Sequence, residues 1–310
     1  MVIIGAGPAA LSAAIYTARE DISTTLFEKG AIGGLAAVTD WVDNYPGFAD
    51  GVAGLALSDA MRAQAERFGA KIILGEVLSI ANGGSLKRLQ TTEGEILARA
   101  VLIATGSAYR QIGVPGEKQY YARGVHYCAT CDGAFYRDKK LVVVGGGNSA
   151  AQESVFLTKF ASHIDMLVRG PALRASDILQ RELAKHSDKI TIHLNTTTDE
   201  IVGRDGKVSK VVGTDKTTNQ KVEYLTDGVF VFVGLDPNSA FLAGSGVELD
   251  ENKFIKSDSR LQTNVAGIFV AGDVRSGATL QIASASGEGA TAALMIREYL
   301  DGLKRLPATD

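Results

Sequence analysis

Two stretches of this chain repeat one pattern: a short β-branched strand, a glycine-rich turn, an alanine-rich helix and a second strand. We predict the elements of the first stretch at residues 2–4, 8–19 and 24–28, and those of the second at 141–144, 148–159 and 164–168. A segment of this kind is a βαβ unit of the dinucleotide-binding type. The duplication therefore predicts two nucleotide-binding domains.

Breaks in the chain indicate how these domains are connected. Apolar strands at 100–104 and 228–233 each run into a glycine, as central strands do when they end at a ligand. Glycine and proline cluster at 111–117, and a polar segment with Pro237 follows Gly234. We predict an α/β fold of two Rossmann-like, three-layer dinucleotide-binding domains, one inserted in the other. The outer domain takes residues 1–110 and 235–310, and the inserted domain takes 111–234.

Composition narrows the choice of partners and location. The chain has 310 residues and a formal net charge of -3 from intermixed charges, without a basic stripe, so we expect no nucleic-acid partner. The first eighteen residues carry no charged side chain. No basic leader precedes them, however, and Gly5, Gly7 and Pro8 interrupt the run early, so we expect a buried strand and helix rather than a signal peptide or membrane span. A cytoplasmic location is expected.

The only two cysteines are Cys128 and Cys131, followed at once by Asp132 and Gly133. A dithiol at this spacing can close as a disulfide and reopen, and one closely spaced pair in a large chain is typical of a redox motif. The pair lies between the two glycine-rich turns, at 5–10 and 145–150. This arrangement predicts a reductase with an internal electron path.

The residue after each second strand distinguishes the nucleotides. Glu28 lies about twenty residues past the first turn, where a carboxylate accepts hydrogen bonds from ribose hydroxyls, as FAD or NAD requires. In the second unit this place is taken by Arg169, with Arg174 five residues on, and a guanidinium there suits the 2′-phosphate of NADPH. Asp273 ends an apolar strand near the C-terminus, where it could bind the polyhydroxy chain of a flavin.

Seven motifs occur in an order typical of one family. They are Gly5-Ala6-Gly7-Pro8-Ala9, Gly33-Gly34, Asp43-Asn44-Tyr45-Pro46-Gly47, Ala104-Thr105-Gly106, Cys128-Ala129-Thr130-Cys131-Asp132-Gly133, Gly145-Gly146-Gly147-Asn148 and Ala271-Gly272-Asp273. With them the chain resembles, over nearly its whole length, the low-molecular-weight, bacterial-type thioredoxin reductases. The resemblance implies a homodimeric flavoprotein that reduces the disulfide of thioredoxin or a similar small redox protein.

The resemblance also implies a set of site residues. Cys131 is the thiol that faces the flavin, Cys128 attacks the partner's disulfide, and Asp132 exchanges the proton of the dithiol. FAD is expected at Gly5, Gly7, Pro8, Ala9, Glu28, Gly33, Gly34, Leu35, Asn44, Ala104, Thr105, Gly106, Gly272, Asp273, Gln281 and Ile282. NADPH is expected at Gly145, Gly147, Asn148, Ser149, Arg169 and Arg174. In this family one domain rotates against the other, and we expect the hinge near Gly113 and Pro237.

Several positions depart from the family pattern. The usual His-Arg-Arg reads Val168-Arg169-Gly170 here, which removes one guanidinium. A charge-assisted hydrogen bond contributes about 1.5 to 3 kcal/mol, so its loss weakens NADPH roughly ten- to a hundredfold. Leu35 and Leu280 stand where Gln and Arg are usual, close to the expected flavin. NADPH stays the favoured donor, with ferredoxin as the alternative and NADH also open.

Two other classes of protein compete with this interpretation. A flavin-dependent NAD(P)H oxidase would make the dithiol incidental, which Asp132 and the surrounding hexapeptide argue against. A metal-binding module would use His126, Cys128 and Cys131, with a fourth ligand from His163, His186, His193 or a distant carboxylate, but no second cysteine pair exists. We therefore predict no metal site, and we read the four histidines as surface or structural residues.

The aromatic residues Trp41, Tyr45 and Phe48 surround Asn44 in the sequence. They are candidates for a wall beside the flavin. For Trp41, packing in the core of the outer domain is at least as plausible an expectation.

Overall fold

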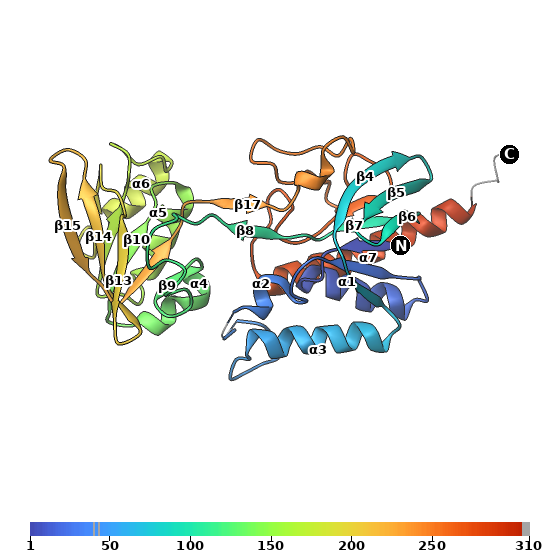
Figure 1. Cartoon of the computed structure of the whole chain (residues 1–310), viewed down its shortest axis with the longest axis horizontal. Helices are drawn as coiled ribbons and strands as arrows, with labels where there is room; N and C mark the ends of the chain where they lie inside the picture. Colours follow the sequence, from blue (N-terminus) through green and yellow to red (C-terminus); the bar gives the residue numbers. More distant parts are fainter. Residues whose placement is uncertain (40, 43, 306–310) are drawn as a thin grey trace. The chain divides into compact units, whose positions relative to one another are not determined.

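The computed structural model describes residues 1–39, 41, 42 and 44–305, so the motif residue Asp43 lies outside the described residues. The chain divides into two compact units (Figure 1). Unit 1 combines residues 1–108 with 236–310, and unit 2 comprises residues 109–235. Both contain a parallel sheet covered on two faces, which confirms the α/β class with two Rossmann-like units.

A five-stranded parallel sheet forms the centre of unit 1, in the order β18-β7-β1-β2-β3. Its strands are β1 (Val2–Ile4), β2 (Thr25–Glu28), β3 (Lys71–Leu74), β7 (Val101–Ile103) and β18 (Ile268–Val270). Because side chains alternate along a strand, each strand contributes to two cores. Ile3, for example, packs with the helices, whereas Val2 and Ile4 face the other side of the sheet.

Helices cover one face of this sheet and a small antiparallel sheet covers the other (Figure 1). The helices are α1 (Pro8–Arg19), α3 (Gly54–Arg67) and α7 (Ile282–Arg305). The second sheet consists of β4 (Val77–Gly83), β5 (Leu86–Thr91) and β6 (Gly94–Ala98). A β-carbon at Gly289 of α7 would collide with the Ala9 carbonyl oxygen, so this glycine permits the close approach of α7 to α1.

Unit 2 repeats the three-layer plan. Its parallel sheet has the order β12-β11-β10-β16-β9. The strands are β9 (Val125–His126), β10 (Lys140–Val144), β11 (His163–Leu167), β12 (Ile190–His193) and β16 (Gly228–Val231). One face packs on α5 (Asn148–Leu157) and α6 (Asp177–Ala184). The other packs on the antiparallel sheet of β13 (Glu200–Arg204), β14 (Lys207–Asp215) and β15 (Gln220–Leu225).

The chain passes between the units twice, at β8 (Ser107–Tyr109) and β17 (Leu235–Pro237), and these strands pair with each other. Pro237, expected at the hinge, is the last residue of β17. Gly113, the other expected hinge residue, is held within unit 2. The buried Glu117 carboxylate accepts hydrogen bonds from the backbone N–H groups of Ile112 (2.9 Å) and Gly113 (2.7 Å). A hinge near Gly113 and Pro237 stays a prediction.

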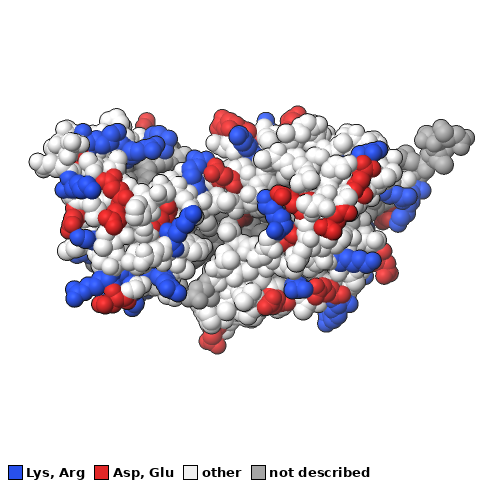
Figure 2. All heavy atoms as spheres, viewed as in Figure 1, with Lys and Arg blue, Asp and Glu red and all other residues white. Residues whose placement is uncertain are grey.

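Acidic and basic side chains are interspersed on the face drawn in Figure 2, over unit 1 and over unit 2. Within the described ranges, none of the helices combines the length and the apolar character that crossing a membrane requires.

Candidate active site

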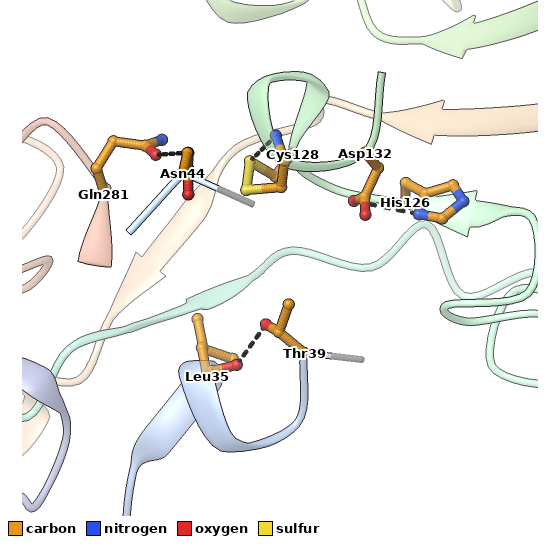
Figure 3. Close-up of a disulfide and its surroundings, with 8 residues drawn as sticks. Leu35, Thr39, Asn44, His126, Cys128, Asp132 and Gln281 are labelled. Carbon is orange, nitrogen blue, oxygen red and sulfur yellow. Dashed lines mark hydrogen bonds and ion pairs between the residues drawn. A yellow bond between two sulfur atoms is a disulfide. The ribbon is translucent and has the colours of Figure 1, made fainter. Parts of the chain in front are cut away.

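Cys128 and Cys131 form a disulfide at the start of the short helix α4 (Ala129–Asp132) (Figure 3). Cys128 is the N-cap residue: its sulfur accepts a hydrogen bond from the Cys131 N–H (3.1 Å), and its carbonyl accepts one from the Asp132 N–H (3.2 Å). Both cysteines are half-buried. The disulfide and Asp132 thus lie on the same helical turn.

Asp132 is held by a buried histidine (Figure 3). The Asp132 Oδ2 atom lies 3.2 Å from His126 Nδ1, and His126 Nε2 lies 2.7 Å from the Tyr136 hydroxyl. His126 ends β9, two residues before the disulfide, whereas Tyr136 ends the 3₁₀ helix η1 (Gly133–Tyr136) that follows it. The imidazole therefore connects the segments on either side of the redox pair.

Aromatic packing fixes this histidine. The His126 ring stacks on Phe230 of β16 at 5.2 Å between centroids and meets the edge of Tyr136 at 5.3 Å. Two glycines allow the close packing. A β-carbon at Gly228 would collide with the Tyr136 ring, and one at Gly133 would lie 2.9 Å from Leu157 Cδ2. Burial and then the charges of Asp132 and Asp227 raise the pKa of Tyr136, so its hydroxyl keeps its proton.

In unit 1 the glycine turn after β1 leads directly into α1. Gly5 has φ +101°, and a β-carbon there would collide with the Ala104 carbonyl oxygen. Gly7 is the N-cap of α1 and offers no side-chain cap, with Pro8 at the first helical position and the buried Ala9 next. The first N–H groups of this helix are therefore left for an anion such as a pyrophosphate.

The Glu28 carboxylate binds this turn. It accepts hydrogen bonds from the N–H groups of Ala6 (2.8 Å) and Gly30 (2.7 Å), one on each oxygen. Each carboxylate oxygen has two lone pairs, so both can still accept from a ribose hydroxyl. Glu28 thus both shapes the turn and remains an acceptor at the end of β2.

The second glycine pair adjoins the first turn. The Gly33 N–H donates to the Ala6 carbonyl (2.8 Å), and a β-carbon at Gly34 would lie 3.5 Å from the Gly7 Cα. Leu35 is exposed in α2 (Gly34–Ala37), and its carbonyl accepts from the Thr39 hydroxyl (Figure 3).

Asn44 and Gln281 are brought together from distant parts of the sequence. The Asn44 side-chain amide donates to Gln281 Oε1 at 3.0 Å (Figure 3). Gln281 immediately precedes Ile282, the first residue of α7. Two predicted flavin contacts thus form one polar pair at the start of this helix.

The turn after β7 is tied to the segment after β17. The Thr105 hydroxyl donates to the Asn238 carbonyl (2.7 Å), and the Asn238 amide donates to the Thr105 carbonyl (2.8 Å). The Asn238 N–H also donates to the Gly106 carbonyl (3.0 Å). Ala104 is buried against Gly5, so this turn lies beside the first glycine turn. Asn238 was not predicted as a site residue.

After β18, Gly272 and Asp273 form a further part of the site. A β-carbon at Gly272 would lie 3.1 Å from the Ala9 Cβ, and the Gly272 N–H donates to Glu288 Oε2 (2.8 Å). Glu288 also pairs with Arg275 at 2.5 Å. Burial, and then the nearby charge of Glu288, raise the pKa of Asp273 to about 6. In the described part of the chain, the Asp273 carboxylate accepts no hydrogen bond, so it is an unmet acceptor suited to a polyol hydroxyl.

Removing this charge is expected to stabilise the flavin-free protein. Because the pKa of Asp273 is raised to about 6 in the folded protein, ionisation of this carboxyl lowers the free energy of unfolding. The loss is absent below about pH 4, where the carboxyl is protonated in both states, and complete above about pH 6. Two pKa units correspond to about 3 kcal/mol, so Asp273→Asn should raise the free energy of unfolding by about 2 to 3 kcal/mol at pH 8. Urea unfolding of the apoprotein at pH 8 and pH 4 measures this difference, and an equal gain at both pH values would contradict it.

Unit 2 has a comparable turn between β10 and α5. Gly145 has φ +148°, and a β-carbon there would collide with the Phe232 carbonyl oxygen. Gly147 is the N-cap of α5 without a side-chain cap. Asn148 Oδ1 accepts from the Ser176 N–H (2.9 Å), and Ser149 is exposed in the first turn of the helix.

Three cations surround the end of β11. Arg169 and Arg174 have exposed side chains, and the Arg174 N–H donates to the Gly146 carbonyl (2.7 Å), which places its backbone against the glycine turn. The exposed Lys216 lies in the turn after β14, and its Nζ donates to the Arg169 carbonyl (3.5 Å). Lys216 was not predicted, because 47 residues separate it from Arg169.

Two expectations need correction. Trp41 is 42% exposed, so it does not pack in the core of unit 1, whereas Tyr45 is half-buried there. Of the two readings offered for the histidines, surface or structural, the structural one holds for His126, which is buried and lies 3.2 Å from Asp132, and the surface one does not. Cys128 and Cys131, two of the ligands that the metal alternative requires, are bonded to each other. The described residues also contain no group of three His, Cys, Asp or Glu placed to hold a metal ion.

Comparisons with known proteins agree on one family. The family model described as pyridine nucleotide-disulphide oxidoreductase matches residues 1–289. A thioredoxin reductase of Bacillus subtilis is 43% identical over 304 residues, covering 98% of this chain and 95% of the relative. The crystal structure of a thioredoxin reductase from Streptococcus pyogenes MGAS5005 superposes with a TM-score of 0.91 at 40% identity, over 97% of each chain. A thioredoxin reductase from Giardia duodenalis superposes equally well, with a TM-score of 0.91 at 33% identity over 97% of this chain and 98% of its own.

Proposed function

The chain belongs to the thioredoxin reductase family of pyridine nucleotide-disulphide oxidoreductases, and we propose that it passes electrons from NADPH through FAD to the Cys128–Cys131 disulfide and on to thioredoxin or a similar small redox protein. The observation that carries this proposal is the redox disulfide on the turn that also bears Asp132. The overall reaction consumes one NADPH and one proton for each disulfide reduced to a dithiol.

The residues of unit 1 fit FAD. The uncapped start of α1 suits the pyrophosphate, Glu28 has acceptor capacity for a ribose, and Asp273 is an unmet acceptor for the ribityl chain. When bound, FAD would supply two-electron transfer between the nicotinamide and the disulfide. Unit 2 would hold NADPH at Gly145, Gly147, Asn148 and Ser149, with Arg169 and Arg174 on the 2′-phosphate.

The protein's own residues complete the chemistry at the disulfide. We assign Cys131 to the exchange of electrons with the flavin and Cys128 to the attack on the partner's disulfide. Opening either disulfide releases a thiolate, which needs a proton in the pH range where the enzyme works. Asp132 follows Cys131 directly and is half-buried, so it is the group we assign to give and take this proton.

Anaerobic mixing tests the electron donor. We expect NADPH to bleach the flavin absorbance of the purified holoprotein within milliseconds to seconds and to support thioredoxin reduction. Bleaching by reduced ferredoxin, with no response to NADPH, would replace the donor while leaving the disulfide chemistry in place. A colourless protein that retains no FAD would contradict the proposal as a whole.

Substitution of the basic residues at the end of β11 gives a second test of NADPH as the electron donor. Arg169→Ala should raise KM for NADPH about ten- to a hundredfold and leave KM for NADH unchanged, because a guanidinium–phosphate contact contributes about 1.5 to 3 kcal/mol. Lys216→Ala should act in the same direction, since Lys216 lies against Arg169 and can take the place of the missing guanidinium. Arg204→Ala is the control, because Arg204 is exposed at the end of β13 in the same unit.

We also propose a homodimer in the cytoplasm. The family resemblance supports the dimer, which light scattering of the holoprotein measures. The single closely spaced cysteine pair supports the location, because such pairs are typical of redox motifs in reducing compartments.

A further inference from the structure

We propose that His126 is a positioning residue for the proton-exchanging carboxyl of Asp132, and that the Tyr136 hydroxyl in turn fixes the imidazole. This inference rests on the proposed function, because it assigns a role in the dithiol step. It rests on three polar side chains of unit 2 that form one chain of contacts beside the disulfide: Asp132 Oδ2 to His126 Nδ1 at 3.2 Å, and His126 Nε2 to Tyr136 at 2.7 Å.

The partners determine which imidazole nitrogen carries the proton. An ionised carboxylate offers only acceptor oxygens, so the contact at 3.2 Å between Asp132 Oδ2 and His126 Nδ1 is favourable when Nδ1 carries a proton. In the neutral imidazole, Nε2 is then an acceptor, and the Tyr136 hydroxyl must donate to it. Tyr136 therefore selects the tautomer that binds Asp132. The phenol remains a donor throughout the working pH range, because burial and the charges of Asp132 and Asp227 raise its pKa.

This arrangement assigns the exchanged proton to one oxygen. Oδ2 is the carboxylate oxygen in contact with His126 Nδ1, whereas Oδ1 has no polar side-chain partner among the residues the structure describes. A proton on Oδ1 leaves Oδ2, the oxygen that faces His126, unprotonated. Asp132 can thus gain and lose a proton without changing its rotamer, with Oδ1 as the atom that exchanges it.

The His126 ring is closely packed on both sides. His126 is 8% exposed, and its ring is held between Phe230 and Tyr136. The other titratable groups that feel this carboxylate are phenols: burial and then the charge of Asp132 raise the pKa of Tyr121, as they do for Tyr136. Among the described residues, His126 is the one basic side chain that pairs with Asp132.

Two substitutions of His126 separate positioning from packing. His126→Phe keeps an aromatic ring against Phe230 but removes both nitrogens, whereas His126→Asn keeps an N–H donor near the place of Nδ1. We expect His126→Phe to slow the dithiol step about ten- to a hundredfold, because it removes the polar side chain that contacts the charged Asp132 carboxylate. Its pH profile should also differ from that of the wild type, because the carboxylate loses its contact with the imidazole. His126→Asn should retain most of the rate and the wild-type profile.

A second measurement does not require the flavin. The rate of iodoacetamide alkylation of the dithiothreitol-reduced protein, followed against pH, reports the proton exchange of the thiols with Asp132. We expect the same ordering of variants in this assay. Tyr136→Phe, which keeps its ring over Gly228 and loses only the hydroxyl, should shift both profiles in the direction of His126→Phe by a smaller amount.

Three results would overturn the inference: wild-type rate and pH profiles in His126→Phe, equal slowing in His126→Phe and His126→Asn, or unchanged profiles in Tyr136→Phe. The Tyr136→Phe result tests the inference even if His126→Phe does not fold. The proposed function has a separate test, because Cys131→Ser should remove thioredoxin reduction whatever His126 does. If His126→Phe has the rate and pH profile of the wild type while Cys131→Ser is inactive, positioning by His126 is rejected and the proposed reductase function stands.

Discussion

The double variant Cys128→Ser, Cys131→Ser should lose thioredoxin reduction by more than about a thousandfold, because removing a catalytic nucleophile commonly costs that much or more. The variant should still bind FAD, since the expected flavin contacts of unit 1 include neither cysteine. The measurement is NADPH-dependent reduction of thioredoxin, with NADPH consumption in air recorded in parallel. Full NADPH consumption together with unchanged thioredoxin reduction would indicate that the disulfide is incidental.

The single variants distinguish the roles of the two sulfurs. With Cys131 replaced, a Cys128 thiolate can still attack a partner disulfide but nothing resolves the product, so Cys131→Ser should accumulate a mixed disulfide with thioredoxin. Cys128→Ser should form none. Because the chain has only two cysteines, mass spectrometry identifies the adduct without ambiguity. An adduct on Cys131 instead would exchange the two assignments.

The second large effect is expected for Asp132→Asn, which should slow the dithiol step about a hundredfold or more, the range typical of a lost general acid or base. The amide is close in size to the carboxyl and retains an acceptor oxygen for His126, so the turn should keep its conformation. Rapid mixing of the reduced enzyme with thioredoxin, at several pH values, measures the step. Flavin content should equal that of the wild type.

Asp138→Asn is the matched control for this substitution. Asp138 is exposed, lies in the same segment and has φ +59°, a conformation that asparagine tolerates. Turnover should be unchanged in this variant. Unchanged turnover in Asp132→Asn as well would remove Asp132 from the mechanism.

Sequence patterns anticipated the elements around the glycine turns well. The first strand and the helix Pro8–Arg19 have the predicted bounds, and the second strand begins one residue later, at Thr25. In unit 2 the strand begins at Lys140 rather than 141, the helix ends at Leu157 rather than 159, and the next strand is His163–Leu167, one residue earlier than predicted. Helix and strand ends depend on individual hydrogen bonds, which periodicity does not resolve.

The two antiparallel sheets were not predicted, although the sequence contains their signals. Alternating residues in β5 and glycine turns such as Thr92-Glu93-Gly94 and Asp205-Gly206 are typical of hairpins. Each of these sheets covers one face of a parallel sheet, a face that the helices leave uncovered.

His126 could not be placed in the site from its spacing. Asp132 lies six positions after it, which is not a neighbouring position on a helix face and is about 20 Å away along an extended strand, so neither regular element would bring the two together. Their contact depends on β9 pairing with β16 and on the 3₁₀ turn that returns Tyr136 to the same imidazole. Glu288, Asn238 and Lys216 escaped prediction for the same reason, since each meets its partner only through the tertiary fold.

The Cys128–Cys131 bond closes a ring between residues only three apart. By the loop-entropy estimate a ring this small restricts the unfolded chain by about 2 kcal/mol, much less than a bond across a hundred residues. The hydrogen bond from the Asp132 N–H to the Cys128 carbonyl does not involve either sulfur, so the turn keeps this anchor when the bond is cut. An enzyme built in this way can break and remake the same covalent link at every turnover with little change in the stability of its fold.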